Sequence, residues 1–335
     1  MITVENLTKS FRSQTGPVVA LDGVTLDVPA GKIAGVVGAA GSGKSTLARL
    51  IALQDRPDSG VIRLDGQNIS TLDPRGLRAA RSRIGVVPSG ESLLGQRTAA
   101  GNIALPLEQA GMDGPARRAK VGKLLDLIGL TDKAATYPDR LTPGQRRRVA
   151  VARALVREPD VLLADDPTAG VDPDGAAGVL TVLDRARTEL GATVLVATAD
   201  AGVVRKIADD VAILEHGRIL EHGGLLDLVQ DPDSRIAKAI LPAITDPAPG
   251  SAHDRVADVV LVGFAAVGAL LPEASARFGV DISVVGGGLT RLGETPVARF
   301  RIGVSGERAD SAIAWIADRG GLVRQAATGP RGVAA

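Results

Sequence analysis

The sequence predicts an α/β fold built on a parallel sheet, followed by a smaller α+β domain. Short runs that are apolar on both faces recur with helical stretches between them, at 33–37, 84–87, 161–164, 193–198 and 211–214. Such runs are typical of parallel strands that helices cover on both faces. A glycine-rich loop pattern directly follows the first run, and near the C-terminus a strand-like alternation precedes a helix-like spacing. These three observations define two structural units.

Length and composition indicate the number of domains and exclude some partners and some kinds of site. The chain has 335 residues, more than the roughly 150 that one domain usually takes, which favours two domains. Its 39 basic and 38 acidic residues are mixed along the chain, so we expect no nucleic-acid partner. The absence of cysteine excludes disulfides, thiolate metal sites and cysteine nucleophiles.

No segment has the pattern of an export signal or a membrane span. Residues 1–6 show no basic stretch followed by an apolar one, so we expect the protein to stay inside the cell. The most apolar run, 259–271, is shorter than the roughly 18 to 20 residues that cross a bilayer. Gly263 and Gly268 interrupt this run, so we expect a buried strand and then a helix.

The larger domain is expected to cover residues 1–240. Leucines between the second and third apolar runs predict a helical subdomain at about 90–158. Residues 241–253 contain three prolines and little to bury, which predicts a linker. The second domain is expected at 254–328, where period two in 298–304 and helical spacing in 309–316 give, with the flanking segments, the order βαββαβ.

The loop after the first strand has the pattern G-x-x-x-x-G-K-[ST] and precedes a helix. Its glycines allow backbone N–H groups to face phosphates, Lys44 would neutralise β/γ-phosphate charge, and Ser45 would offer a hydroxyl to Mg²⁺. The alternative is a chance glycine-rich turn. The predicted ATP-binding residues are Gly38, Ala39, Ala40, Gly41, Ser42, Gly43, Lys44, Ser45 and Thr46.

Two carboxylates, Asp165 and Asp166, directly follow the run 161–164. In a phosphate-loop protein the first would hold Mg²⁺ and the second would polarise the attacking water, which makes Asp166 the candidate catalytic residue. The alternative is that both are ordinary loop acids.

Residues 141–155, LTPGQRRRVAVARAL, resemble the signature segment that separates ABC ATPases from other phosphate-loop proteins. The resemblance implies that Thr142, Gly144 and Gln145, with Asp172 of a D-loop-like segment, act at a nucleotide held by another subunit. Phe11 stands where the family places an aromatic against adenine, and its alternative role is core packing.

The resemblance extends to one branch of that family and covers nearly the whole chain. Residues 93–107 resemble the ATPases of methionine importers, and 276–280 with 312–316 resemble their C-terminal NIL domain, which has an ACT-like fold. The implied fold is an α/β P-loop NTPase core of ABC type with a helical subdomain, followed by a ferredoxin-like or ACT-like βαββαβ domain.

This resemblance also implies partners and a location. Because the chain has one phosphate loop, a second nucleotide-binding subunit, the same or different, would complete each ATP site. Integral membrane permease subunits would contact residues around 93–102, an extracellular substrate-binding protein would act indirectly, and methionine would bind the NIL domain. The chain would lie at the cytoplasmic face of the membrane.

Four positions depart from the family pattern: Ser89 replaces the Q-loop glutamine, Asp166 the catalytic glutamate, Ala199 the switch histidine and Pro143 a signature glycine. One interpretation is tolerated drift in an importer ATPase. Another is a regulatory subunit that binds ATP and hydrolyses it slowly, paired with an intact ATPase. A soluble ABC ATPase without a transport role is a third, disfavoured because the chain shows neither a second cassette nor a long coiled-coil insertion.

Overall fold

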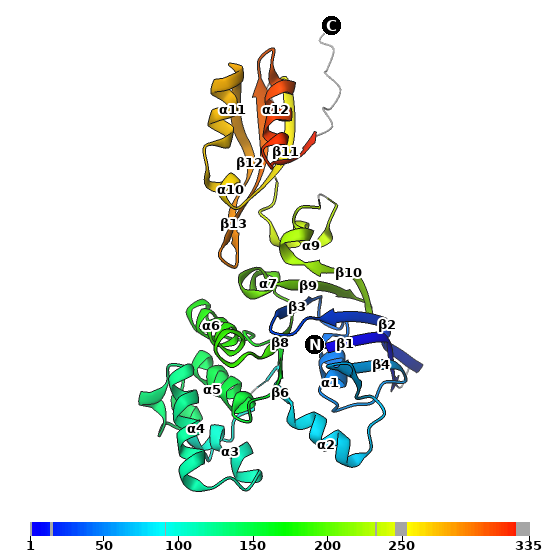
Figure 1. The fold of residues 1–335 in the computed structure, drawn as a ribbon, viewed down its shortest axis with the longest axis vertical. Helices are drawn as coiled ribbons and strands as arrows, with labels where there is room; N and C mark the ends of the chain where they lie inside the picture. The colour runs from blue at the N-terminus through cyan, green and yellow to red at the C-terminus, as the bar shows by residue number, and fades with distance from the viewer. Residues whose placement is uncertain (1, 14–15, 91, 232, 245–252, 326–335) are drawn as a thin grey trace. The chain divides into compact units, whose positions relative to one another are not determined.

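The computed structural model describes residues 2–13, 16–90, 92–231, 233–244 and 253–325. The chain divides into two compact units, Met1–Gly223 and Gly224–Ala335, which are described separately (Figure 1). The prolines predicted to form a linker include two at 247 and 249, which lie with the rest of 245–252 outside the described residues.

A six-stranded sheet in the order β10-β9-β3-β8-β7-β6 forms the centre of the first unit. Parallel pairing joins β9 to β3, β3 to β8, β8 to β7 and β7 to β6. The strands are β3 (Ile33–Val37), β6 (Ile84–Val87), β7 (Val161–Asp165), β8 (Thr193–Thr198), β9 (Asp210–Glu215) and β10 (Arg218–Gly224). The predicted parallel sheet is confirmed, since all five apolar runs occur in it.

A second, antiparallel sheet in the order β2-β1-β4-β5 was not predicted from the sequence. Its strands are β1 (Ile2–Ser13), β2 (Gly16–Val28), β4 (Ser59–Leu64) and β5 (Gln67–Asn68). In β2 the apolar residues Val24, Leu26 and Val28 are buried and the polar residues between them are exposed. This period-two alternation is the signal that could have located the sheet.

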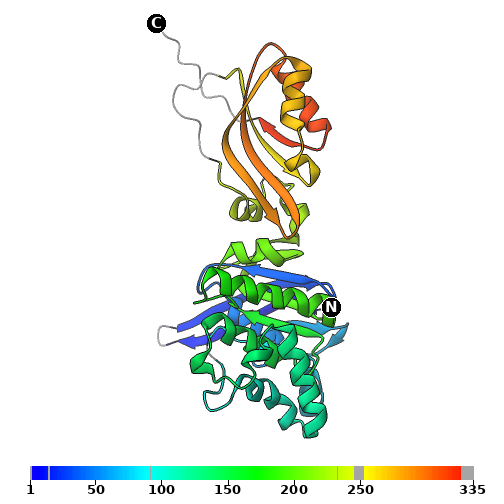
Figure 2. The ribbon, with the colours of Figure 1, turned by 90° about the vertical axis from the view of Figure 1, so that its left-hand side faces the viewer.

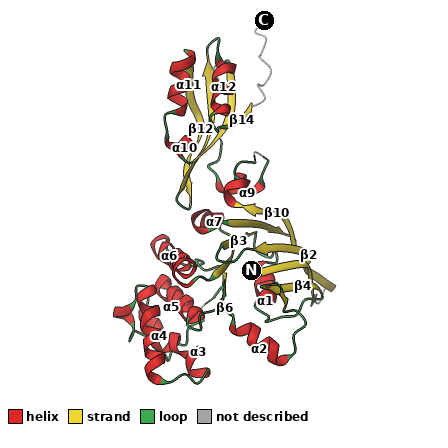
Figure 3. Cartoon of the chain, in the orientation of Figure 1, coloured by secondary structure: helices red, strands yellow, loops and turns green. Residues whose placement is uncertain are grey.

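Helices cover the parallel sheet and also form a separate subdomain, as predicted. Next to the sheet are α1 (Lys44–Ile51), α2 (Pro74–Ser82), α6 (Pro173–Leu190) and α7 (Ala201–Ile207). The subdomain contains α3 (Ala99–Gln109), α4 (Gly114–Leu127) and α5 (Pro143–Leu155), with short 3₁₀ turns at Thr131–Lys133 and Pro138–Arg140. Figure 3 shows α3, α4 and α5 grouped together, and their buried leucines share one core with α6.

Helix starts in this unit follow the capping chemistry of their sequences. Thr98, Asp113, Thr142 and Asp172 each accept a hydrogen bond from a backbone N–H in the first turn of the following helix. A side-chain oxygen at this position satisfies a donor that has no partner within the helix. These caps fix where α3, α4, α5 and α6 begin.

The second unit contains the predicted βαββαβ order. After α8 (Leu225–Leu228) and α9 (Arg235–Ile240) come β11 (Arg255–Val262), α10 (Phe264–Val267), α11 (Leu270–Phe278), β12 (Asp281–Leu292), β13 (Thr295–Ser305), α12 (Ala309–Asp318) and β14 (Leu322–Gln325). The sheet order is β12-β13-β11-β14 with antiparallel pairs. Figure 2 shows α11 and α12 on the same side of this sheet, over an apolar core.

The apolar run 259–271 is a strand followed by helices, as expected, and Gly263 at φ 66° makes the turn between them. The division between the two units falls after Gly223, so that α8 and α9 are grouped with the second unit. The predicted domain limits of 1–240 and 254–328 stay a prediction.

Candidate functional site

The loop between β3 and α1 wraps around a buried lysine. Lys44 is 6% exposed, and its Nζ donates to the carbonyl oxygens of Gly38 at 2.8 Å and Ala39 at 2.9 Å. No carboxylate of the described residues lies within ion-pair distance of this ammonium group. Its charge is therefore offset only by carbonyl dipoles, which leaves it suited to an added anion such as a phosphate.

Two glycines of this loop are required by the backbone path. A Cβ on Gly38 would lie 2.2 Å from the carbonyl oxygen of Leu214. Gly43 has φ 110°, and a Cβ there would lie 2.5 Å from the carbonyl oxygen of Ala20. No other residue fits either position without a shift of the backbone. The loop therefore has the strand–loop–helix setting that the phosphate-loop pattern requires.

Strand pairing brings Asp165 to the same edge of the sheet as this loop. Asp165 pairs with Ala197 of β8, and Ala197 pairs with Val36 of β3, one residue before the end of that strand. The N–H of Gly38 donates to the carbonyl oxygen of Thr198 at 3.3 Å. The carboxyl ends of β3, β7 and β8 thus gather the loop and the acid in one place.

Two oxygens near this edge are buried and lack partners within the described structure. They are Oδ1 of Asp165 and Oγ of Ser42. Burying a carboxylate oxygen without a donor or a cation is costly. Ser45, one residue into α1, has an exposed side chain. This donor set fits a bound phosphate group with a divalent cation.

Asp166 follows in a left-handed backbone conformation with φ 44°. Its N–H donates to the carbonyl oxygen of Ala197 at 2.7 Å, and its Oδ1 accepts from the N–H of Ala199 at 3.2 Å. The candidate catalytic carboxylate is therefore held against the backbone at the position where the resemblance expects a histidine.

The signature-like residues begin α5 with a complete capping box. The N–H of Gln145 donates to Oγ1 of Thr142 at 3.2 Å, and the N–H of Thr142 donates to Oε1 of Gln145 at 2.9 Å. Pro143 occupies the first turn, where a missing N–H has no structural consequence. The proline is therefore compatible with the start of this helix.

Gly144 and Asp172 have structural partners on α6. A Cβ on Gly144 would lie 2.7 Å from Cα of Gly175, so the two helices contact each other through their backbones. Oδ1 of Asp172 accepts from the N–H of Gly175 at 2.8 Å and caps α6. Within this one chain Gly144 lets α5 approach α6 closely and Asp172 caps α6. The nucleotide contacts inferred from the resemblance stay predictions.

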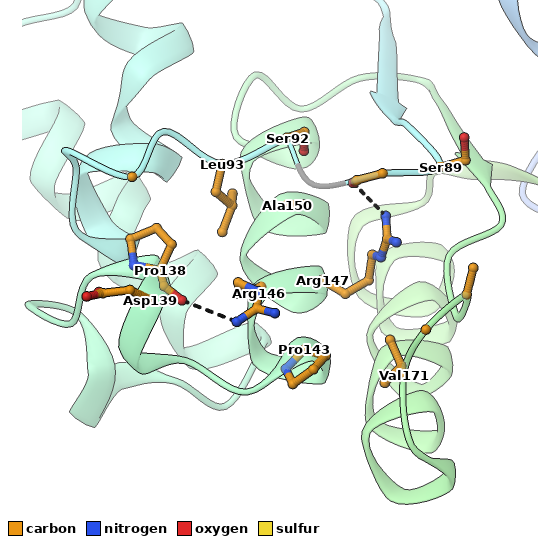
Figure 4. A pocket seen from close by; sticks show the side chains of 14 residues that line it. Ser89, Ser92, Leu93, Pro138, Asp139, Pro143, Arg146, Arg147, Ala150 and Val171 are labelled. Atoms are coloured by element: carbon orange, nitrogen blue, oxygen red, sulfur yellow. Dashed lines mark hydrogen bonds between the residues drawn. The ribbon is translucent and has the colours of Figure 1, made fainter.

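A pocket of about 750 Å³ opens beside the signature turn (Figure 4). Three segments that are far apart in the sequence form it: the loop after β6, the start of α5 and the loop before α6. Two of the departures from the family pattern, Ser89 and Pro143, line it, and no residue of the phosphate loop does. Its other side chains include Leu93, Asp139, Arg146, Arg147, Ala150 and Val171.

Phe11 is not a core residue. Its side chain is 38% exposed on β1, and Nζ of Lys9 lies 5.5 Å from the centre of its ring. Val18, opposite Phe11 in the register of β1 and β2, is also exposed. The alternative of core packing is therefore wrong, and stacking of this ring on adenine stays a prediction.

The sequence matches two family profiles, ABC transporter over residues 21–169 and NIL domain over residues 255–324. A methionine import ATP-binding protein of Thermobifida fusca is 42% identical over 325 residues, 97% of this chain and 99% of the relative. The chain belongs to the ABC transporter ATP-binding family. Another such relative, from Myxococcus xanthus, is 39% identical over 98% of this chain and 100% of its own length.

Solved ABC cassettes share the fold of the first part of this ABC ATPase. A dimeric cassette in a post-hydrolysis state with bound ADP and Pi is 31% identical, with a TM-score of 0.62, and covers 67% of this chain and 98% of its own. The cassette cbiO1 of Clostridium perfringens, part of the transporter complex cbiONQ, is 29% identical with a TM-score of 0.61, over 67% and 88% of the two chains. Within the described part of this ABC ATPase, no helix has the length and apolarity needed to cross a membrane.

Sequence reasoning missed the residues that organise the loop after β6. Asn102 is fully buried; its Oδ1 accepts from the N–H of Leu94, and its Nδ2 donates to the carbonyl oxygens of Leu94, Arg97 and Thr98. Two arginines of α5, described below, hold the same loop. Asn102 is a polar residue in the otherwise apolar stretch 99–107, and this contrast could have predicted a buried structural role for it.

Proposed function

We propose that this chain is the ATP-binding subunit of an importer for methionine or a related amino acid, and that it couples ATP binding and hydrolysis to transport. The supporting observation is that two groups lie at the same edge of the sheet: the buried ammonium group of Lys44 and the carboxylate oxygen of Asp165 that lacks a partner. The names of the relatives that match nearly the whole chain supply the substrate class.

The nucleotide would bind with Mg²⁺ held by Ser45 and Asp165. Within the described residues no group of three or more histidine, aspartate or glutamate side chains forms a metal site. Magnesium commonly takes one or two protein oxygens and completes its coordination with substrate phosphates and water. The ion would supply charge neutralisation at the β- and γ-phosphates. In the protein, Lys44 would bind the phosphates, Phe11 would stack on the base, and Asp166 would orient the water.

We propose a dimer in which the signature of one subunit faces the phosphate loop of the other. Thr142, Gly144, Gln145 and Asp172 would then act at the partner's nucleotide. Residues 93–102 would contact membrane permease subunits at the cytoplasmic face, with a substrate-binding protein outside the cell acting through them. Methionine would bind the βαββαβ domain and regulate transport.

Calorimetry with Mg·ATP tests the proposal. Lys44→Ala deletes a charge-assisted phosphate contact, so ATP affinity should fall at least about tenfold. Lys120→Ala is the matched control, because this partly exposed lysine on α4 pairs with Glu158 and not with the phosphate loop. Equal affinity in both variants would refute the assigned site. Steady-state turnover with and without the permease then separates an importer ATPase from a subunit with little hydrolysis, an alternative that the relatives do not favour.

A further inference from the structure

One guanidinium group binds the backbone on both sides of Ser89. Nη1 of Arg147 donates to the carbonyl oxygens of Pro88 at 2.8 Å and Gly90 at 3.2 Å. Figure 4 shows this side chain reaching from α5 to the loop after β6. Hydrogen bonds from a charged donor are about twice as strong as neutral ones. The backbone at Ser89 is thus fixed from both sides while its own side chain is exposed.

A second arginine of the same helix holds the loop farther along. Nη1 and Nη2 of Arg153 donate to the carbonyl oxygen of Ser92 at 2.7 Å and to its Oγ at 2.8 Å. Arg153 is half-buried, and desolvation lowers the pKa of its guanidinium. No described carboxylate pairs with it, so the loop supplies the hydrogen bonds that this buried charge needs. Helix and loop therefore stabilise each other.

The spacing along α5 explains how the loop can lie so close. Arg147, Ala150 and Arg153 recur every three residues and follow one stripe of the helix. Ala150, which lies between the two arginines on this stripe, is buried and small, and it lines the pocket together with Arg147. The loop can therefore approach the helix backbone between two cationic anchors.

The side chains that hold this loop come from the helical subdomain. Arg147 and Arg153 belong to α5, and Asn102 belongs to α3. On the other side, the loop continues from β6, which is the edge strand of the parallel sheet and pairs only with β7. The anchoring residues thus tie the loop to the subdomain rather than to the sheet that carries the phosphate loop.

We propose that Arg147 is a positioning residue that makes the loop at Ser89 move with α5. The place of Ser89 is then set by the helix that begins at Thr142, through the backbone carbonyl groups of Pro88 and Gly90. This inference rests on the proposed function and deepens it, because it names Arg147 as a residue of the same cassette that influences the rate of ATP turnover. Arg147 acts through the loop and is not itself a catalytic residue.

The test compares Arg147→Met and Arg147→Lys in the full-length chain, with Arg148→Met as the control. The Arg148 guanidinium donates to the carbonyl oxygen of Ile128 at 2.8 Å, inside the helical subdomain. The measurements are the backbone NMR order parameters S² of Ser89 and Gly90, ATP affinity by calorimetry, and kcat.

Arg147→Met should lower these order parameters from the rigid value of about 0.85 to below about 0.6 and lower kcat about fivefold or more, with less than about a twofold change in ATP affinity. Arg147→Lys, which can reach one carbonyl group, should give intermediate values, and it tests the proposal by itself if Arg147→Met does not fold. Unchanged order parameters in both Arg147 variants, or an equal fall in Arg148→Met, would overturn the proposal. If the wild-type chain does not bind ATP, the proposed function is refuted, while the order parameters still decide the role of Arg147.

Discussion

The carboxylate of Asp166 accepts a hydrogen bond from the backbone N–H of Ala199 at 3.2 Å. This contact links two departures from the family pattern, a shortened acid and a missing histidine. Aspartate tolerates its left-handed backbone better than most residues do. The backbone of Ala199 therefore holds the acid in place, at the position where the histidine side chain of the family pattern is missing, and the two positions form one unit.

Restoring the family residues should raise turnover more than affinity. The combined change Asp166→Glu, Ala199→His and Ser89→Gln returns a longer acid and a γ-phosphate contact, each of which typically contributes about a hundredfold to rate. We expect the wild-type homodimer to turn over at least about a hundredfold below the usual 1 to 10³ s⁻¹, and kcat to rise in the triple variant with ATP affinity nearly constant. Steady-state kinetics and calorimetry measure both. A wild-type rate in the usual range that the three changes leave unaltered would show that the departures are tolerated drift.

Gly144→Ala should destabilise the first unit. The new Cβ would lie 2.7 Å from Cα of Gly175, so α5 and α6 would have to separate, at a cost of about 1 to 3 kcal/mol in the free energy of unfolding. Urea denaturation measures the change. Gly122→Ala on α4 is the control, because its Cβ would meet no atom within 4 Å and helix propensity favours alanine by about 1 kcal/mol. Equal effects of the two variants would contradict the close contact.

Asp58 should contribute to acid sensitivity. A hydrogen bond from the N–H of Ser10, and then one from Lys9, lowers the pKa of this carboxyl below its ordinary value of 3.8. A lowered folded-state pKa gives stability that is present above the unfolded value and lost as pH falls through the folded one.

The unfolding free energy of the wild type should therefore drop more steeply below about pH 4 than that of Asp58→Asn. Denaturant unfolding across this range checks the slope. Glu294→Gln, whose side chain is 100% exposed, should follow the wild-type curve. Parallel curves for wild type and Asp58→Asn would show that the contact contributes nothing.

Residues 254–335 should fold without the cassette and form a dimer. The described part has its own core, in which Val259, Ile302 and Ile316 are fully buried. Its sheet ends in the long edge strand β12, where Val284 and Leu289 are exposed, and such edges favour pairing with a second copy. Cooperative heat unfolding and a dimer mass in sedimentation are the expected results. An unfolded monomer would show that the domain limits are misplaced.

The parallel strands, the phosphate-loop pattern and the βαββαβ order could be predicted from the sequence. Each of these depends on periodicity or spacing within a short window, where neighbours along the chain decide the structure. The antiparallel sheet also left a short-range signal in the alternation of β2. The pairings of β1 with β2 and of β1 with β4 are encoded by no local pattern.

The arrangement of the candidate site depends on contacts between distant segments of the chain. The hydrogen bond between Asp166 and Ala199 spans 33 residues, and the one between Arg147 and Pro88 spans 59. The contact of Gly144 with Gly175 likewise depends on how two helices pack, because a glycine in a helix carries no mark of what approaches it. Side-chain types could be read from the sequence, but the distances that give them a role arise when the sheet and the helices bring distant segments together.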